Sequence, residues 1–216
     1  MIFKNIIITI EKHKEIISIG LVWLLHVSAI IGILLGFEDW FMSLSPLNLL
    51  ALFAIIIWNS SDKKQIILTL LIPFFIGFIA EVLGVNFGLI FGDYSYGENL
   101  GVKVLEVPLL IGINWAILTY VASNISKLIN PNIYLSSAIA ALLMTSLDVL
   151  LEVSAPRFDY WEFEGGIAPV QNYIGWYFIS LLACFIFQKF YNKGHFILSF
   201  HIFIAITIFF TFFIFF

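Results

Sequence analysis

The chain has 216 residues, of which 62% are hydrophobic and 11% are charged, and its mean hydropathy is +1.06. Soluble domains are about half apolar and about a quarter charged, so a soluble fold could not hide this much apolar surface from water. The net charge of −4 gives no reason to expect a nucleic-acid partner, and the single cysteine, Cys184, excludes a disulfide framework and a thiol-rich metal site. These properties predict a polytopic membrane protein.

Apolar runs of about 20 residues, the length that crosses the hydrocarbon core as a helix, mark the expected spans. We expect about seven, at residues 16–36, 41–58, 66–92, 104–122, 133–151, 172–190 and 196–216. The second is the weakest, because it is short and carries Pro46. No repeat, long linker or cleavable signal peptide is expected. Residues 1–216 are therefore predicted to form one all-α transmembrane helix bundle.

The placement of lysine and arginine predicts the orientation, because cytoplasmic loops carry an excess of positive charge. Eight lysines fall on one side of the predicted spans: Lys4, Lys12, Lys14, Lys63, Lys64, Lys127, Lys189 and Lys193. Only Lys103 and Arg157 fall on the other side. We therefore expect a multi-pass protein of the cell (inner) membrane, solvated by membrane lipid, with a cytoplasmic N-terminus and an external C-terminus.

Glu81 stands inside the apolar stretch FIAEVLGVNFGLIFGDYSYG, near the outer end of the third predicted span. A buried acid in lipid is costly unless it is paired or functional, so Glu81 is a candidate functional residue. Gly84, Gly88 and Gly92 follow it at four-residue spacing. Such a stripe permits close approach of another helix or of a flat, rigid ligand, and helix packing is the simpler explanation.

A second acidic pair, Asp148 and Glu152, is expected on one helix face near the outer end of the fifth span, because the two residues are four apart. Two carboxylates this close repel each other when both are ionised, so one of them is expected to hold a proton and to act as an acid. A pair hydrated at the membrane interface, or neutralised by Arg157, would explain the same spacing. Asp159, Glu162 and Glu164 are expected to be solvated loop charges.

Aromatic and amide side chains crowd the same side of the protein. The aromatic ones are Tyr94, Tyr96, Tyr160, Trp161, Tyr173, Trp176 and Tyr177, and the amides are Asn86, Asn114, Gln171 and Asn172. Tyrosine and tryptophan form belts at membrane interfaces, which explains many of them, but their π faces also stabilise cations. Buried amides need partners and can position water.

Several enzyme classes lack their required residues. The four histidines form no iron-binding pattern, the last span has no lysine for a retinal Schiff base, and no Walker loop, aspartate-rich diphosphate motif or GxSxG sequence occurs. What the residues support is acid–base chemistry, or passage of a ligand, in an apolar, outward-facing pocket.

Between Glu81 and Trp176 the sequence resembles the integral-membrane carotenoid hydratase family, the CruF-type carotenoid biosynthesis proteins. The resemblance begins with EVLGVNFGLIFGDYSY, from Glu81 to Tyr96. It continues through shorter pieces in order: Leu100-Gly101, Val107-Pro108, Asn114-Trp115, Leu147-Asp148, Ala155-Pro156, Trp161, Pro169, Asn172 and Gly175-Trp176. Two departures stand out, because the family pattern has an aspartate and a proline where this chain has Glu152-Val153, and Gly-Val-Pro where it has Ile167-Ala168-Pro169.

The resemblance implies addition of water to the terminal 1,2 double bond of an acyclic carotenoid end, of lycopene or γ-carotene type, to give a 1-hydroxy carotenoid. It implies no cofactor, and it makes other carotenoid-biosynthesis enzymes candidate partners. The residues that it places at the substrate are Gly84, Gly88, Tyr94, Tyr96, Asn114, Trp115, Trp161, Asn172 and Trp176.

The residues themselves fit this chemistry. Hydrating a trisubstituted alkene needs an acid that protonates the less substituted carbon and a base that helps water to capture the tertiary cation. We expect Asp148 and Glu81 to fill these two roles, in either order, with Glu152 in support, and Trp161, Trp176 and Tyr94 to shield the cation. A carotenoid cyclase, which uses the same protonation, and a membrane carrier or proton-coupled transporter are the alternatives.

Overall fold

The computed structural model describes the backbone of residues 2–216 and the side chains of residues 13–216. The described residues form eight helices: α1 (Ile2–Leu34), α2 (Glu38–Ser43), α3 (Ser45–Asn59), α4 (Lys63–Phe87), α5 (Leu109–Ile129), α6 (Ile133–Ser154), α7 (Val170–Phe190) and α8 (Phe196–Phe215). Four short strands lie between them: β1 (Tyr94–Tyr96), β2 (Lys103–Val104), β3 (Val107–Pro108) and β4 (Trp161–Phe163). The predicted all-α membrane bundle is confirmed.

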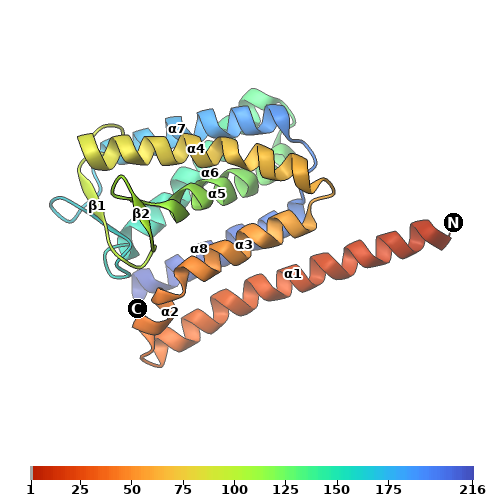
Figure 1. Ribbon diagram of the computed structural model, residues 1–216, viewed down its shortest axis with the longest axis horizontal. Helices are drawn as coiled ribbons and strands as arrows, with labels where there is room; N and C mark the ends of the chain where they lie inside the picture. Colours follow the sequence, from red (N-terminus) through yellow and green to blue (C-terminus); the bar gives the residue numbers. More distant parts are fainter. Residues whose placement is uncertain (1) are drawn as a thin grey trace.

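Six of the described helices are long and apolar enough to cross a membrane, namely α1 from His13 onward and α4 to α8. The remaining predicted span forms α3, which has 15 residues. At 1.5 Å per residue α3 is about 22 Å long, shorter than the roughly 30 Å hydrocarbon core. Figure 1 shows α3 running alongside the longer helices, with the N-terminus and the C-terminus at opposite ends of the bundle. Termini at opposite ends are what the predicted seven passes would produce.

The third predicted span, 66–92, is too long at its C-terminal end. α4 begins after Asp62, whose carboxylate accepts a hydrogen bond from the Gln65 backbone N–H at 2.9 Å, and it ends at Phe87. Gly88 then adopts a left-handed conformation with φ of 64°, and its N–H reaches back to the Gly84 carbonyl oxygen. A left-handed glycine is a common way to terminate a helix, and its sequence signal is the same as that of a packing glycine.

The fourth predicted span, 104–122, starts too early and also ends too early. Lys103 to Pro108 form an antiparallel hairpin instead, because Leu105 and Glu106 both have positive φ, 53° and 65°, as a tight two-residue turn requires. The helix that follows, α5, therefore runs from Leu109 to Ile129.

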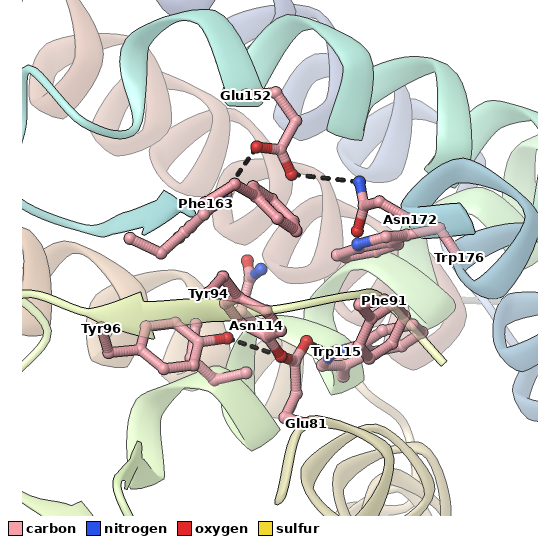
Figure 2. A pocket seen from close by; sticks show the side chains of 12 residues that line it. Glu81, Phe91, Tyr94, Tyr96, Asn114, Trp115, Glu152, Phe163, Asn172 and Trp176 are labelled. Atoms are coloured by element: carbon pink, nitrogen blue, oxygen red, sulfur yellow. Dashed lines mark hydrogen bonds between the residues drawn. The ribbon is translucent and has the colours of Figure 1, made fainter. Parts of the chain in front are cut away.

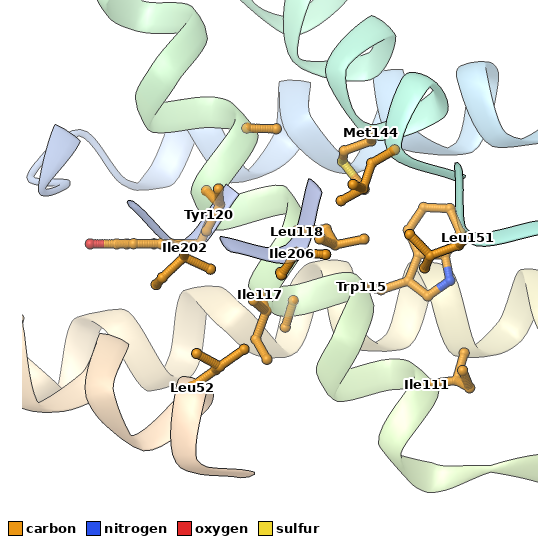
Figure 3. Close-up of a cluster of buried hydrophobic side chains, with 14 of the residues drawn as sticks. Leu52, Ile111, Trp115, Ile117, Leu118, Tyr120, Met144, Leu151, Ile202 and Ile206 are labelled. Carbon is orange, nitrogen blue, oxygen red and sulfur yellow. The ribbon is translucent and has the colours of Figure 1, made fainter. Parts of the chain in front are cut away.

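α5 is the central helix of the bundle. Every residue from Trp115 to Ser126 is buried, and α5 contacts α3, α4, α6, α7 and α8. Figure 3 shows side chains of α5, including Ile117 and Leu118, packed against Leu52 of α3 and Ile206 of α8. A helix buried on all sides must be mainly apolar or small on all sides, as most of these residues are, and the buried Asn124 amide donates a hydrogen bond to the Ser199 hydroxyl at 3.1 Å.

The charged residues separate to the two ends of the bundle. Lys63 and Lys64 begin α4, Lys127 lies in the last turn of α5, and Lys189 in the last turn of α7, all at the end where the N-terminus lies (Figure 1). The side chains of Lys4 and Lys12 lie outside the described residues. The opposite end carries the strands and most of the acidic residues, and which end faces the cytoplasm remains a prediction.

Candidate active site

Glu81 lies near the end of α4 that faces the strands, and its side chain is only 3% exposed. Three side chains donate hydrogen bonds to its carboxyl group. The Trp115 indole N–H, from α5, reaches Oε1 at 2.9 Å, the Tyr96 hydroxyl reaches Oε2 at 2.7 Å, and the Tyr94 hydroxyl also donates to Oε2. A carboxylate surrounded by donors is well suited to the ionised state, in which it only accepts hydrogen bonds.

The two tyrosines reach Glu81 because they lie two apart on β1. Alternate residues of a strand point to the same face, and β1 pairs in antiparallel register with β4, so that Tyr94 lies opposite Phe163 and Tyr96 opposite Trp161. Burial, and next the charge of Glu81, raise the pKa of both Tyr94 and Tyr96 well above the usual range of a phenol. Both hydroxyls therefore remain protonated and keep donating to Glu81.

Glycines on either side of Glu81 make room for its partners. A Cβ at Gly84 would lie 2.8 Å from the Tyr94 hydroxyl, and a Cβ at Gly77 would collide with the Trp115 ring. Gly77, Glu81 and Gly84 share one face of α4, since they are four and three residues apart. The glycines that make room for the partners of Glu81 are therefore Gly77 and Gly84, and Gly77 was not predicted as part of the site.

The predicted stripe of Gly84, Gly88 and Gly92 on one helix is wrong beyond Gly84. Gly88 caps α4 with positive φ, and Gly92, with φ of 98°, lies in the loop that follows. A Cβ at Gly92 would come within 2.8 Å of Pro169, so this glycine permits close packing of two loops. The physical reason for the error is the end of the helix at Phe87, which removes the shared face.

Asp148 and Glu152 lie one turn apart on α6, on a shared face as their spacing predicts. The side-chain N–H₂ of Asn172, from α7, donates to both of them, at 2.9 Å to Asp148 Oδ2 and 3.2 Å to Glu152 Oε1. The indole N–H of Trp161, on β4, donates to Glu152 Oε2 at 3.0 Å. Asp148 is 1% exposed, and its Oδ1 has no hydrogen-bond partner among the described residues.

Arg157 does not neutralise this pair, so that alternative is wrong. Its guanidinium group forms two hydrogen bonds to the Glu38 carboxylate, at 3.0 and 2.7 Å, and stacks over Phe213. Hydrogen bonding to Glu38 raises the pKa of Arg157 above its already high usual value. Asp148 and Glu152 form no ion pair with any described residue whose side chain is placed.

A small cavity of about 20 Å³ lies between Glu81 and Glu152, which face it from opposite sides in Figure 2. A space of this size holds about one water molecule. Nine predicted site residues line it: Glu81, Tyr94, Tyr96, Asn114, Trp115, Glu152, Trp161, Asn172 and Trp176. The predicted residues Asp148, Gly84 and Gly88 do not line it, and Asp148 lies behind Asn172.

Aromatic rings form most of the remaining wall. Trp115 and Trp176 stack with ring centroids 4.3 Å apart and an interplanar angle of 13°, and Phe163 packs against Tyr94 at 5.1 Å. Phe91, Ile111 and Phe163 complete the lining. Sequence reasoning missed these three, because an apolar residue in a chain this apolar carries no signal of its own.

A second, larger cavity of about 310 Å³ adjoins the first, and its lining is mostly apolar. Ile111, Asn114 and Trp161 line both cavities. Within the described part of the chain, the Asn114 amide forms no hydrogen bond to the protein, so it is available to a molecule at the junction. Water-sized polar space and ligand-sized apolar space therefore meet at these three side chains.

Comparison with known proteins identifies the family. Residues 40–216 match the sequence profile of a family described as carotenoid biosynthesis protein. No curated protein and no solved structure matches the chain. The matched region contains every residue of both carboxyl clusters and extends well beyond the segment from Glu81 to Trp176 that carries the sequence resemblance. The chain therefore belongs to the carotenoid biosynthesis protein family, and its role lies in carotenoid biosynthesis.

Proposed function

We propose that this protein adds water across the terminal 1,2 double bond of an acyclic carotenoid end, of lycopene or γ-carotene type. The product is a 1-hydroxy carotenoid with a tertiary hydroxyl group. One observation carries the proposal: Glu81 and Glu152 line the same water-sized cavity, and that cavity adjoins an apolar cavity large enough for part of a hydrocarbon chain. Two carboxyl groups beside one water supply the acid and the base that hydration needs.

Glu152 is the acid in this proposal. Glu152 and Asp148 accept from the same amide nitrogen of Asn172, and two carboxylates so close repel each other when both are ionised. One proton shared by the pair removes that repulsion. Glu152 is the member of the pair that lines the cavity, so the acid role, for which the sequence offered either Asp148 or Glu81, goes to Glu152, one turn along α6 from Asp148.

Glu81 is the base. Its three donors, Tyr94, Tyr96 and Trp115, favour the ionised carboxylate and fix its position. An ionised Glu81 at the cavity wall orients a water molecule and accepts its proton. The unpaired Asn114 amide on the same cavity supplies a further hydrogen-bonding group for that water.

The chemical step balances without an oxidant or a reductant. The Glu152 proton bonds to C2 of the terminal alkene, whose π electrons form the new C–H bond and leave a tertiary cation at C1. The water oxygen then bonds to C1, and the proton that it loses passes to Glu81. After the product leaves, the next water molecule enters the cavity and relays the proton from Glu81 back to Glu152, which restores the starting state.

The stacked indoles of Trp115 and Trp176, with Trp161 and Phe163, surround the place where the cation forms. Aromatic faces attract cations, and each such contact is worth about 0.5–2 kcal/mol, more when water is excluded. The same rings keep bulk water away, so the single water held by Glu81 and Asn114 is the nucleophile. A cyclase needs no water beside the acid, so a water-sized cavity between the two carboxyl groups favours capture of the cation by water.

The test is expression in a lycopene-accumulating bacterial host, followed by mass analysis of the pigments. The proposal predicts a gain of one water, equally in air and without oxygen. A cyclised product keeps the mass of its substrate, a carrier yields no new pigment, and a hydroxylase requires oxygen. Glu81→Gln and Glu152→Gln should each reduce conversion by a factor of about 10² to 10⁴, the usual contribution of one acid or base.

Glu162→Gln is the matched control, because Glu162 is an exposed carboxylate on β4 next to Trp161. The same isosteric change there should leave conversion unaltered. Full activity of both Glu81→Gln and Glu152→Gln, with both proteins present in the membrane, would refute the proposed roles.

A further inference from the structure

The larger cavity lies among α1, α2, α3, α5, α6 and α8, beside the carboxyl site but distinct from it. Its volume of about 310 Å³ falls within the range of about 300–1,000 Å³ that is typical of small-molecule pockets. Its walls are mainly leucine, isoleucine and phenylalanine side chains. A mostly apolar space of this size inside a membrane protein favours a hydrocarbon ligand.

The polar groups on its wall are mostly satisfied by the protein. The Ser45 hydroxyl is hydrogen-bonded to the Tyr160 hydroxyl at 2.7 Å, and the Ser28 hydroxyl donates to the Leu25 carbonyl oxygen at 3.1 Å. The His26 Nδ1–H donates to the Val22 carbonyl oxygen at 2.8 Å. The exceptions are two amides: Asn48, whose buried Oδ1 has no hydrogen-bond partner among the described residues, and Asn114 at the junction with the smaller cavity. The rest of the wall offers a ligand few free donors or acceptors.

One face of α5 leads from this cavity to the carboxyl site. Ile111, Asn114 and Leu118 are three and four residues apart, so they lie on the same side of the helix. Ile111 and Asn114 line both cavities, and Leu118, one turn further along, lines only the larger one. Moving along this face, a ligand passes from the apolar Leu118 side chain to the Asn114 amide and then to the carboxyl groups.

The other end of the cavity reaches the surface at α2 and the start of α3. Trp40 and Leu47 line the cavity, and they are 58% and 59% exposed. Both are large apolar side chains of a kind that packs favourably against lipid. A hydrocarbon dissolved in the bilayer can enter here without crossing water.

We propose that the larger cavity binds the acyclic isoprenoid arm of the substrate and delivers its end to Asn114. This inference rests on the proposed hydration, since it supplies that reaction with its substrate. The arm that enters is the one that ends in the reacting alkene, so its terminal carbons reach the carboxyl groups beyond Asn114.

The test fills the larger cavity with a bulky side chain and measures polyene binding separately from hydration. Leu118→Trp, on α5, and Leu52→Trp, on α3, place an indole in the cavity from two different helices. Leu142→Trp is the matched control, because Leu142 on α6 is 57% exposed and does not line the cavity. The readout is the amount of acyclic polyene that co-purifies with each detergent-solubilised protein, measured by its visible absorption.

Leu118→Trp and Leu52→Trp should each retain at least about tenfold less polyene than the wild type, which corresponds to a loss of about 1.4 kcal/mol of binding free energy. Leu142→Trp should retain as much polyene as the wild type. The control Leu142→Trp should also hydrate a short acyclic terpene with the same terminal alkene, as the wild type does, because neither cavity is changed. Wild-type polyene retention by both cavity variants would overturn the inference. If the wild type retains polyene but adds no water to it, the proposed hydration fails and the binding site stands.

Discussion

Glu81 on α4 and Glu152 on α6 face one water-sized cavity from opposite sides. Each carboxyl group is fixed by side chains from other elements, Glu81 by Tyr94, Tyr96 and Trp115, and Glu152 by Asn172 and Trp161. Glu81 meets three donors, whereas Glu152 shares its Asn172 donor with a second acid. Different surroundings of this kind allow one fold to hold a base and an acid together.

Asp148→Asn should be less damaging than Glu152→Gln. Asp148 contacts the site only through Asn172, so its loss disturbs the acid without removing it, whereas Glu152→Gln removes the proton donor. We expect at least about tenfold more residual conversion in Asp148→Asn, since removal of a general acid costs about 10² to 10⁴. Pigment analysis of the two variants at equal protein level checks this. Equal loss in both would place Asp148 at the reacting atoms.

Gly84→Ala should lower activity without loss of the folded protein. The added Cβ would lie 2.8 Å from the Tyr94 hydroxyl and 3.0 Å from the ring carbon Cε1, so Tyr94 must move away from Glu81. Gly20→Ala in α1 is the control, because a Cβ at Gly20 meets no other atom within 4 Å. The control should keep full activity and gain up to about 1 kcal/mol from the lower flexibility of alanine. A Gly84→Ala protein with wild-type turnover would show that the Tyr94 hydrogen bond is dispensable.

Asn114→Leu should separate water positioning from substrate binding. Leucine keeps the size of the side chain and makes the junction more apolar, so polyene retention should be unchanged. Hydration should fall by about tenfold or more, since the variant removes one hydrogen bond to the reacting water. The two measurements are pigment co-purification and conversion of the short terpene. Parallel loss of both would assign Asn114 to binding rather than to the reaction.

Ionisation of the buried Tyr160 hydroxyl should lower the stability of the folded protein at alkaline pH. Burial raises the pKa of Tyr160 to about 12, from about 10 in an unfolded chain. The folded protein therefore binds more protons than the unfolded one between pH 10 and 12, and stability falls as the pH rises through that window. Two pKa units correspond to at most about 3 kcal/mol.

Thermal unfolding in one detergent at pH 9 and pH 11.5 measures this effect. Tyr160→Phe should be less stable than the wild type at pH 9, because it loses the hydrogen bond to Ser45, but it should lose less stability on going to pH 11.5. An identical pH-dependent loss in both proteins would mean that Tyr160 titrates as it does in water.

The membrane bundle and both acidic clusters could be predicted from the sequence, because a carboxyl group in an apolar run is conspicuous and residues four apart share a helix face. Which acid of the α6 pair lines the cavity could not be predicted. Asp148 and Glu152 point in nearly the same direction from the helix, and the choice depends on where Asn172 of α7 packs between them. The pairing of Glu81 with Glu152 is therefore a result of tertiary packing.

The roles of the individual glycines could not be predicted from the sequence either, because they depend on the backbone conformation. Gly84 and Gly88 read alike in the sequence, yet one admits a tyrosine to Glu81 and the other ends the helix. Phe91 and Phe163 reach the cavity from a loop and a short strand, where no periodicity marks a side chain as pointing inward. The long apolar helices were predictable because a membrane imposes their length, and the loops and short strands at the end of the bundle that holds the site obey no such constraint.

The most direct test of the hydration is the origin of the product oxygen. The purified wild-type protein is incubated with an acyclic carotenoid, without oxygen gas, in water labelled with heavy oxygen, and the product is analysed by mass. The account predicts one labelled hydroxyl group per processed end and no reaction in Glu152→Gln. A product of unchanged mass, or an oxygen atom that comes from oxygen gas, would contradict it.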